Sequence, residues 1–263
     1  MNMLLLKLLL TPTLIGVVSL AGRRWGSGIS GWLVGLPLTS GPVIFFLALA
    51  QGNAFAATAA AGILAGVLSV ACFCLGYSWL ALRWGWPLTL FTGWLIFAAS
   101  TWGLEHVSIP VIPVYVGIIA ILALVLWLLP GASQQPIKAT SAWWDIPARM
   151  LFATAFVLAL TELAPHLGPQ LSGLIAPFPI FTTILAVFTH HFQGGAAATP
   201  LLRGVLLGLF AFASFFLIVA VLIEPAGLAT TFLCATIVTL GVHGFSLLIL
   251  QRSRKLRASQ AEP

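Results

Sequence analysis

The sequence predicts an all-α polytopic membrane protein with about nine transmembrane helices, arranged as a 4+1+4 inverted-topology repeat. Three observations lead to this fold class. Of the 263 residues, 60% are hydrophobic and 6% are charged, whereas ordinary soluble domains carry about 25% charged residues. The apolar runs reach the length of about 20 residues that a bilayer-spanning helix needs. Two stretches of the chain, 142 positions apart, also align without a gap.

Short joints rich in glycine, proline and polar residues separate the apolar segments. The segments expected to span the membrane are approximately residues 3–21, 32–50, 58–82, 86–101, 107–129, 146–163, 171–189, 201–223 and 226–250. The first segment also has features of a signal peptide, since it carries Lys7 and ends in VSLAG. We prefer a retained span, because cleavage there would leave Arg23 and Arg24 outside the cell.

The basic residues predict the orientation. If the N-terminus lies outside, one set of joints and the tail contain ten of the 11 Lys and Arg residues, and only Lys7 lies elsewhere. Cytoplasmic loops are enriched in Lys and Arg, so we expect a cytoplasmic C-terminus in a bacterial inner membrane. The basic run RSRKLR at 252–257 is expected to rest on anionic lipid headgroups. No nucleic-acid motif accompanies this run, and no nucleic-acid partner is expected.

The internal repeat predicts the domain organisation. The stretch that begins SGWLVGLPLTSG at Ser30 aligns with SGLIAPFPIFTT at Ser172, and the alignment pairs Pro37 with Pro179. We expect a first four-helix repeat at 1–104, a linking helix and cytoplasmic linker at 105–145, a second repeat at 146–251, and a basic tail at 252–263. The single linking span inverts the second copy. Inverted repeats are a mark of secondary transporters.

The matched prolines predict a broken helix in each repeat, in helices 2 and 7. Irregular backbone at membrane depth is tolerated where protein or a watery cavity surrounds it. The N-terminus of a half-helix carries the positive end of the helix dipole and suits an anionic group. The alternative is that these prolines only kink helices for packing. The candidate substrate-binding residues are Pro37, Thr39, Ser40, Gly41, Pro42, Pro177, Pro179, Thr182 and Thr183.

Few side chains in the spans carry chemistry. Glu162 is the deepest carboxyl group and His166 follows one turn later, so this pair is the candidate for ion coupling, with a solvated surface position as the alternative. His190 and His191 are adjacent and are expected to point in different directions, which disfavours a metal site. His243 is expected to hydrogen-bond within the bundle.

Catalytic and metal-binding patterns do not stand out. Cys72 and Cys74 form only a CxC pair in an apolar run, and packing is the better interpretation. The chain has no HExxH motif, no Walker loop and no Ser–His–Asp pattern. We therefore expect no cofactor, no metal and no enzymatic activity, although an intramembrane enzyme using Glu162 or His166 stays open as an alternative.

The stretch SGLIAPFPIFTTILAVFTHHFQGG, residues 172–195, resembles the core of the small GlpM-like bacterial membrane proteins. Those proteins carry a glycine, a proline-centred turn and an apolar run of this kind in a chain about half as long. The resemblance implies a duplicated and fused form of a unit that pairs with itself, and hence a homodimer as a further expectation. The family is linked to exopolysaccharide production.

Together these features predict a secondary transporter or flippase that moves a small anionic or amphipathic solute by alternating access. The alternative is a non-transporting scaffold subunit of an envelope or exopolysaccharide biosynthesis machine.

Overall fold

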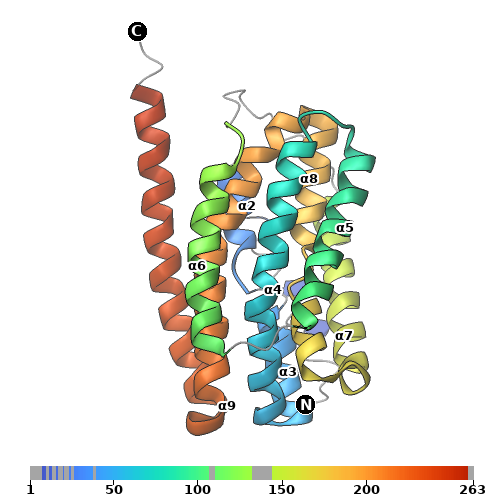
Figure 1. The fold of residues 1–263 in the computed structure, drawn as a ribbon, viewed down its shortest axis with the longest axis vertical. Coiled ribbons are helices and arrows are strands. Elements are labelled where there is room, and N and C mark those ends of the chain that lie inside the picture. The colour runs from blue at the N-terminus through green and yellow to red at the C-terminus, as the bar shows by residue number, and fades with distance from the viewer. Residues whose placement is uncertain are drawn as a thin grey trace.

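The structure, a computed structural model, describes residues 8–9, 12–13, 16, 20, 24, 27–37, 40–106, 110–131 and 144–259. All regular structure in these residues is helical, and the helices lie side by side along the long axis of the molecule (Figure 1). Five described helices are long and apolar enough to cross a membrane. The predicted all-helical class with several membrane-crossing helices is thereby confirmed, while the count of nine stays a prediction.

The helices follow one another with short connections. Their bounds are α2 Ser27–Val34, α3 Ser40–Gln51, α4 Asn53–Leu80, α5 Trp86–Glu105, α6 Val111–Leu128, α7 Asp145–Ile175, α8 Ile180–Gln193, the 3-10 turn η1 Gly195–Ala197, and α9 Ala198–Ser259.

Helices α7 and α9 each contain a reversal of the chain. A straight helix of the 62 residues of α9 would be about 93 Å long at 1.5 Å per residue, three times the hydrocarbon thickness of a bilayer. The helix is interrupted at Gly227 (φ 75°, ψ 173°), directly after Pro225. Figure 1 shows α9 turning there and running back along the bundle to the C-terminus. Helix α7 is interrupted in the same way at Gly168 (φ 77°, ψ 169°).

The same backbone conformation occurs at both QG joints. Gly52 (φ 90°, ψ 169°) joins α3 to α4, and Gly194 (φ 87°, ψ 160°) joins α8 to η1 and α9. Essentially only glycine adopts this region, because a Cβ atom would meet the backbone. The two glycines lie 142 positions apart and perform the same turn from a short helix into a long one.

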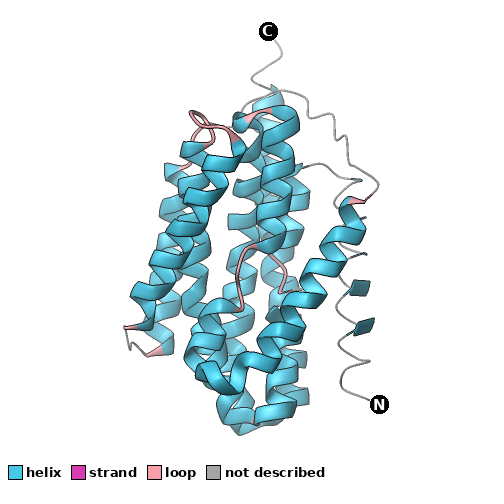
Figure 2. Cartoon of the chain, turned by 90° about the vertical axis from the view of Figure 1, so that its right-hand side faces the viewer, coloured by secondary structure: helices cyan, strands magenta, loops and turns pink. Residues whose placement is uncertain are grey.

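The helix is interrupted at both proline stretches, as predicted. Helix α2 ends at Val34 and α3 begins at Ser40, whereas α7 ends at Ile175 and α8 begins at Ile180. Helices α2 and α3 have 8 and 12 residues, so each is too short to cross the roughly 30 Å of a bilayer core alone. Figure 2 shows loop segments inside the bundle at mid-height, away from its two ends.

Glycines bring the short helices into backbone contact with the long ones. A Cβ atom at Gly31 in α2 would overlap the carbonyl oxygen of Leu201 in α9. At the offset of 142, a Cβ atom at Gly173 in α7 would overlap the carbonyl oxygen of Ala59 in α4. Small residues of this kind let membrane helices approach closely. The contact of α2 with α9 therefore recurs as the contact of α7 with α4.

A second pair of contacts follows the same offset. A Cβ atom at Gly204 would overlap the carbonyl oxygen of Gly28, and one at Gly62 would lie 2.6 Å from the carbonyl oxygen of Gln170. Gly204 and Gly62 begin the two G-x-x-x-G patterns of the sequence. These glycines therefore act in interhelix packing, the structural role that such patterns favour.

We expect Gly173→Ala to lower the free energy of unfolding by about 1–3 kcal/mol, because the added methyl group forces the backbones of α7 and α4 apart. The matched control is Gly241→Ala in α9, where an added Cβ atom meets nothing within 4 Å. There the change removes glycine from a helix, which is neutral or stabilising by up to about 1 kcal/mol. Reversible unfolding in mixed detergent micelles measures both. Equal effects of the two changes would contradict the close contact.

Candidate functional site

The two broken helices meet in the interior of the bundle. Ser40 at the start of α3 donates a hydrogen bond from its Oγ to the carbonyl oxygen of Ala176, directly after α7, over 2.9 Å. Ser40 has 1% of its surface exposed and Ala176 has 0%. The hydroxyl thus satisfies a carbonyl group that the end of α7 leaves without an intrahelical partner. Residues 136 positions apart in the chain are joined at the site that the sequence predicted.

A small cavity lies beside this contact. Its volume is about 40 Å³, which holds no more than a few water molecules at about 10–15 Å³ each. Four of the predicted binding residues line it, namely Ser40, Pro177, Pro179 and Thr182. The other lining residues are apolar and come from α2, α4 and α9 as well as from both breaks. In this conformation the junction of the breaks is closed to any larger solute.

The remaining predicted residues lie near the junction without lining this cavity. Gly41 donates its backbone N–H to the carbonyl oxygen of Pro37 (2.8 Å), which forms a turn before α3. Pro42 is buried in α3. Thr183 donates its backbone N–H to Pro179 (2.7 Å), and its hydroxyl accepts a hydrogen bond from the indole of Trp94 (3.3 Å). Thr39 lies outside the described residues.

The predicted coupling residues do not reach the junction. Glu162 and His166 both lie on the first helical segment of α7, before the reversal at Gly168, and both side chains are exposed. The structure therefore does not bring them together with Ser40 or Thr182. Their role in coupling stays a prediction.

A buried aromatic cluster connects α2 to the second segment of α9. The rings of Trp32 and His243 are stacked, with centroids 3.7 Å apart and an angle of 17° between their planes. The indole of Trp32 donates a hydrogen bond to the hydroxyl of Ser246 (2.8 Å), and this hydroxyl donates to the carbonyl oxygen of His243 (2.8 Å). The cluster fixes the half-helix α2 to a helix more than 200 residues away.

The expectation that His243 hydrogen-bonds within the bundle is wrong. Among the described residues, neither of its ring nitrogens has a hydrogen-bond partner, although only 3% of the residue is exposed. Its neighbour is instead the face of an indole ring. No local pattern in the sequence signals this arrangement, because Trp32 lies far away in the chain.

His190 and His191 point in different directions, as expected. The Nδ1 atom of His190 lies 3.4 Å from the hydroxyl of Tyr77, deep in the core. The ring of His191 instead meets the ring of Trp86 edge to face, 5.9 Å away. Within the described residues, no group of three His, Cys, Asp or Glu side chains is placed to hold a metal ion.

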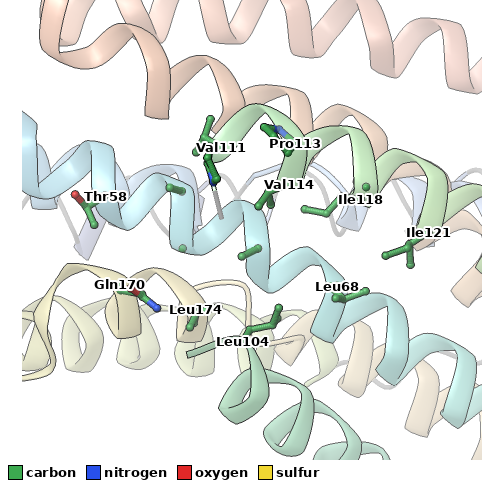
Figure 3. A pocket seen from close by; sticks show the side chains of 15 residues that line it. Thr58, Leu68, Leu104, Val111, Pro113, Val114, Ile118, Ile121, Gln170 and Leu174 are labelled. Atoms are coloured by element: carbon green, nitrogen blue, oxygen red, sulfur yellow. The ribbon is translucent and has the colours of Figure 1, made fainter. Parts of the chain in front are cut away.

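The largest hollow described here is a groove of about 640 Å³ away from the junction. Helices α4, α5, α6 and α7 form its walls, and their lining side chains are apolar except for Thr58 and Gln170. Figure 3 shows these two polar side chains toward one end of the groove, with Leu68 and Ile121 toward the other. The sequence did not predict this groove.

Comparisons with protein-family models, curated proteins and solved structures find no match to this chain. The geometry described above is therefore the basis on which function is argued.

Removing the hydrogen bond between Trp32 and Ser246 should reveal an interaction energy of about 1 kcal/mol, within the range measured for hydrogen bonds in membrane proteins. The variants are Trp32→Phe, Ser246→Ala and their combination, and the measurement is the free energy of unfolding in detergent micelles. A control cycle pairs Trp32→Phe with Thr236→Ala, whose exposed hydroxyl bonds only its own helix at Phe232. The control cycle should be additive within about 0.5 kcal/mol. Additivity of both cycles would count against the contact.

Proposed function

We propose that the chain is a secondary transporter or flippase that moves a small anionic or amphipathic solute across the bacterial inner membrane by alternating access. The observation that carries the proposal is the recurrence of interhelix contacts at an offset of 142 residues: Gly31 against Leu201, and Gly173 against Ala59. Such recurrence is what two related units packed about a pseudo-two-fold axis would produce. In transporters with inverted repeats, the substrate binds at the interface between the units.

The proposed units are residues 1–104 and 146–251, joined by the linking segment 105–145. In this proposal nine helices cross the membrane, with the N-terminus outside and the C-terminus in the cytoplasm. The reversals at Gly168 and Gly227 support this count, because each converts one continuous helix into two segments of opposite direction. The basic tail then lies at the cytoplasmic surface, where anionic lipids attract it.

The proposed substrate site is the junction of the two breaks. Ser40 and Thr182 lie 142 positions apart and line the same cavity, so each unit supplies one hydroxyl group. The N-termini of α3 and α8 begin beside it and favour negative charge. Since the cavity holds only a few water molecules here, the proposal requires another conformation, in which one unit moves against the other and opens the junction.

A scaffold subunit of an envelope-polysaccharide machine is the second candidate. The small volume of the central cavity and the tight glycine contacts favour it, since both suit a rigid bundle. The resemblance to GlpM-like proteins suggests the same setting. This scaffold would keep its function when the hydroxyl groups of the junction are removed.

Cysteine labelling tests the inverted arrangement. After replacement of Cys72, Cys74 and Cys234, single cysteines are placed at Ala50 and Phe192, which lie 142 positions apart and are both exposed. An impermeant maleimide added to intact cells should label the cysteine at position 50, whereas the cysteine at position 192 should react only after the cells are permeabilised. Labelling of both positions in intact cells, or of neither, would remove the inverted repeat.

A lipid-movement assay tests the function itself. The purified protein is reconstituted into vesicles that contain a fluorescent phospholipid, and dithionite quenches the molecules that reach the outer leaflet. We expect faster movement than in empty vesicles, and a loss of about tenfold in rate with Ser40→Ala plus Thr182→Val, because about 1.4 kcal/mol of lost stabilisation corresponds to a factor of ten. Thr236→Val is the control, since its hydroxyl is exposed and far along α9. Absence of movement with the native protein would favour the scaffold.

A further inference from the structure

The groove between α4, α5, α6 and α7 has the size and lining of a ligand site. Its volume of about 640 Å³ lies within the range of roughly 300–1,000 Å³ that is common for small-molecule pockets. An added Cβ atom at Gly117, which lines the groove from α6, would meet nothing within 4 Å. Open space therefore lies against the α6 wall of the groove.

The position of the groove indicates what fills it. Helices α4, α5 and α6 are three of the described helices that are long and apolar enough to cross a membrane, and Ile112 and Val116 on α6 are 65% and 62% exposed. A wall of this kind faces the hydrocarbon chains of the bilayer. An apolar groove at that place excludes water and accommodates a flexible hydrocarbon chain.

One end of the groove is polar. Gln170 lines the groove there and donates its carboxamide N–H to the backbone oxygen of Glu105 (2.9 Å). The Oε2 atom of Glu105 is buried and, among the described residues, has no hydrogen-bond partner. A buried acceptor without a donor costs free energy, so a ligand that brings a donor to this end gains an interaction. An ammonium group supplies such donors and also suits a carboxyl group by charge.

The groove has no equal at the positions related by 142 residues. Leu174 and Leu104, which line it, correspond to Trp32 and Ser246. Trp32 is 8% exposed, is stacked on His243 and is hydrogen-bonded to Ser246. A large indole ring joins the helices there, whereas leucines leave a hollow at the groove. The groove is therefore a feature of one side of the molecule.

We propose that this groove binds one hydrocarbon chain of a membrane lipid whose ammonium headgroup lies beside Glu105 and Gln170. The inference deepens the proposed function, on which it rests, because it names the class of amphipathic molecule that would enter the transport path. The chain lies along α6 between Val111 and Ile121, and the headgroup lies at the end of the groove formed by the C-terminus of α5.

Photolabelling tests the site directly. The full-length protein is reconstituted into vesicles of phosphatidylethanolamine and phosphatidylglycerol that contain a trace of phosphatidylethanolamine with a diazirine on its acyl chain. After irradiation, mass spectrometry should place the label on α6 and on the facing part of α4. Gly117→Leu fills the groove and should lower this labelling about tenfold. The matched control Gly241→Leu adds the same side chain where it also meets nothing within 4 Å, and should leave the labelling unchanged.

A second arm tests the headgroup. Phosphatidylglycerol with the same diazirine chain should label the groove several-fold less than the ethanolamine lipid, and Glu105→Gln should abolish this difference while the chain still binds. Equal labelling by both lipids in the native protein would overturn the assignment of the ammonium group. Labelling of α6 that Gly117→Leu does not change would overturn the groove site and indicate only the surrounding bilayer.

The readout requires no transport, so it separates the two proposals. Specific labelling of the groove in a protein that moves no lipid would retain the site and remove the flippase. Lipid movement without specific labelling would retain the flippase and remove the site.

Discussion

The close approach of helix backbones at glycine positions is the constraint on which this structure depends. In a bilayer, helices gain little from the hydrophobic effect when they associate, so van der Waals contact and interhelix hydrogen bonds have to hold them together. Gly31 and Gly173 meet the carbonyl groups of Leu201 and Ala59 without an intervening side chain. This proximity lets short half-helices lie against long helices along the middle of the bundle.

The position of the half-helices in turn makes the breaks tolerable. A stretch of non-helical backbone has polar groups that lipid cannot satisfy. Here the broken segments lie in the interior, where Ser40 donates to the carbonyl oxygen of Ala176. The prolines reduce the problem further, because proline has no N–H that requires a partner. Packing by glycine and interruption by proline are therefore linked, since the first creates the protected interior that the second requires.

The two halves are related without being identical, and the differences carry the functional argument. The related positions 174 and 32 hold a leucine and a tryptophan, so a groove lies on one side and a stacked, hydrogen-bonded cluster lies on the other. A fully symmetric molecule would offer the same surface on both sides. The asymmetry gives the molecule one accessible apolar site and one closed contact, which is the kind of difference that alternating access requires between its two ends.

The sequence by itself determined the helical class, the helix interruptions at the proline stretches, and the need for glycine at the QG joints. Each of these follows from local chemistry: apolar length, the missing N–H of proline, and a backbone region that Gly52 and Gly194 adopt readily. Only the tertiary structure decided which side chains face the interior. Glu162 is exposed while His243 is buried against Trp32, and the groove lies where four separate helices meet. In helices that are apolar on all sides, the sequence marks no inner face, so burial depends on which distant helix packs against which surface.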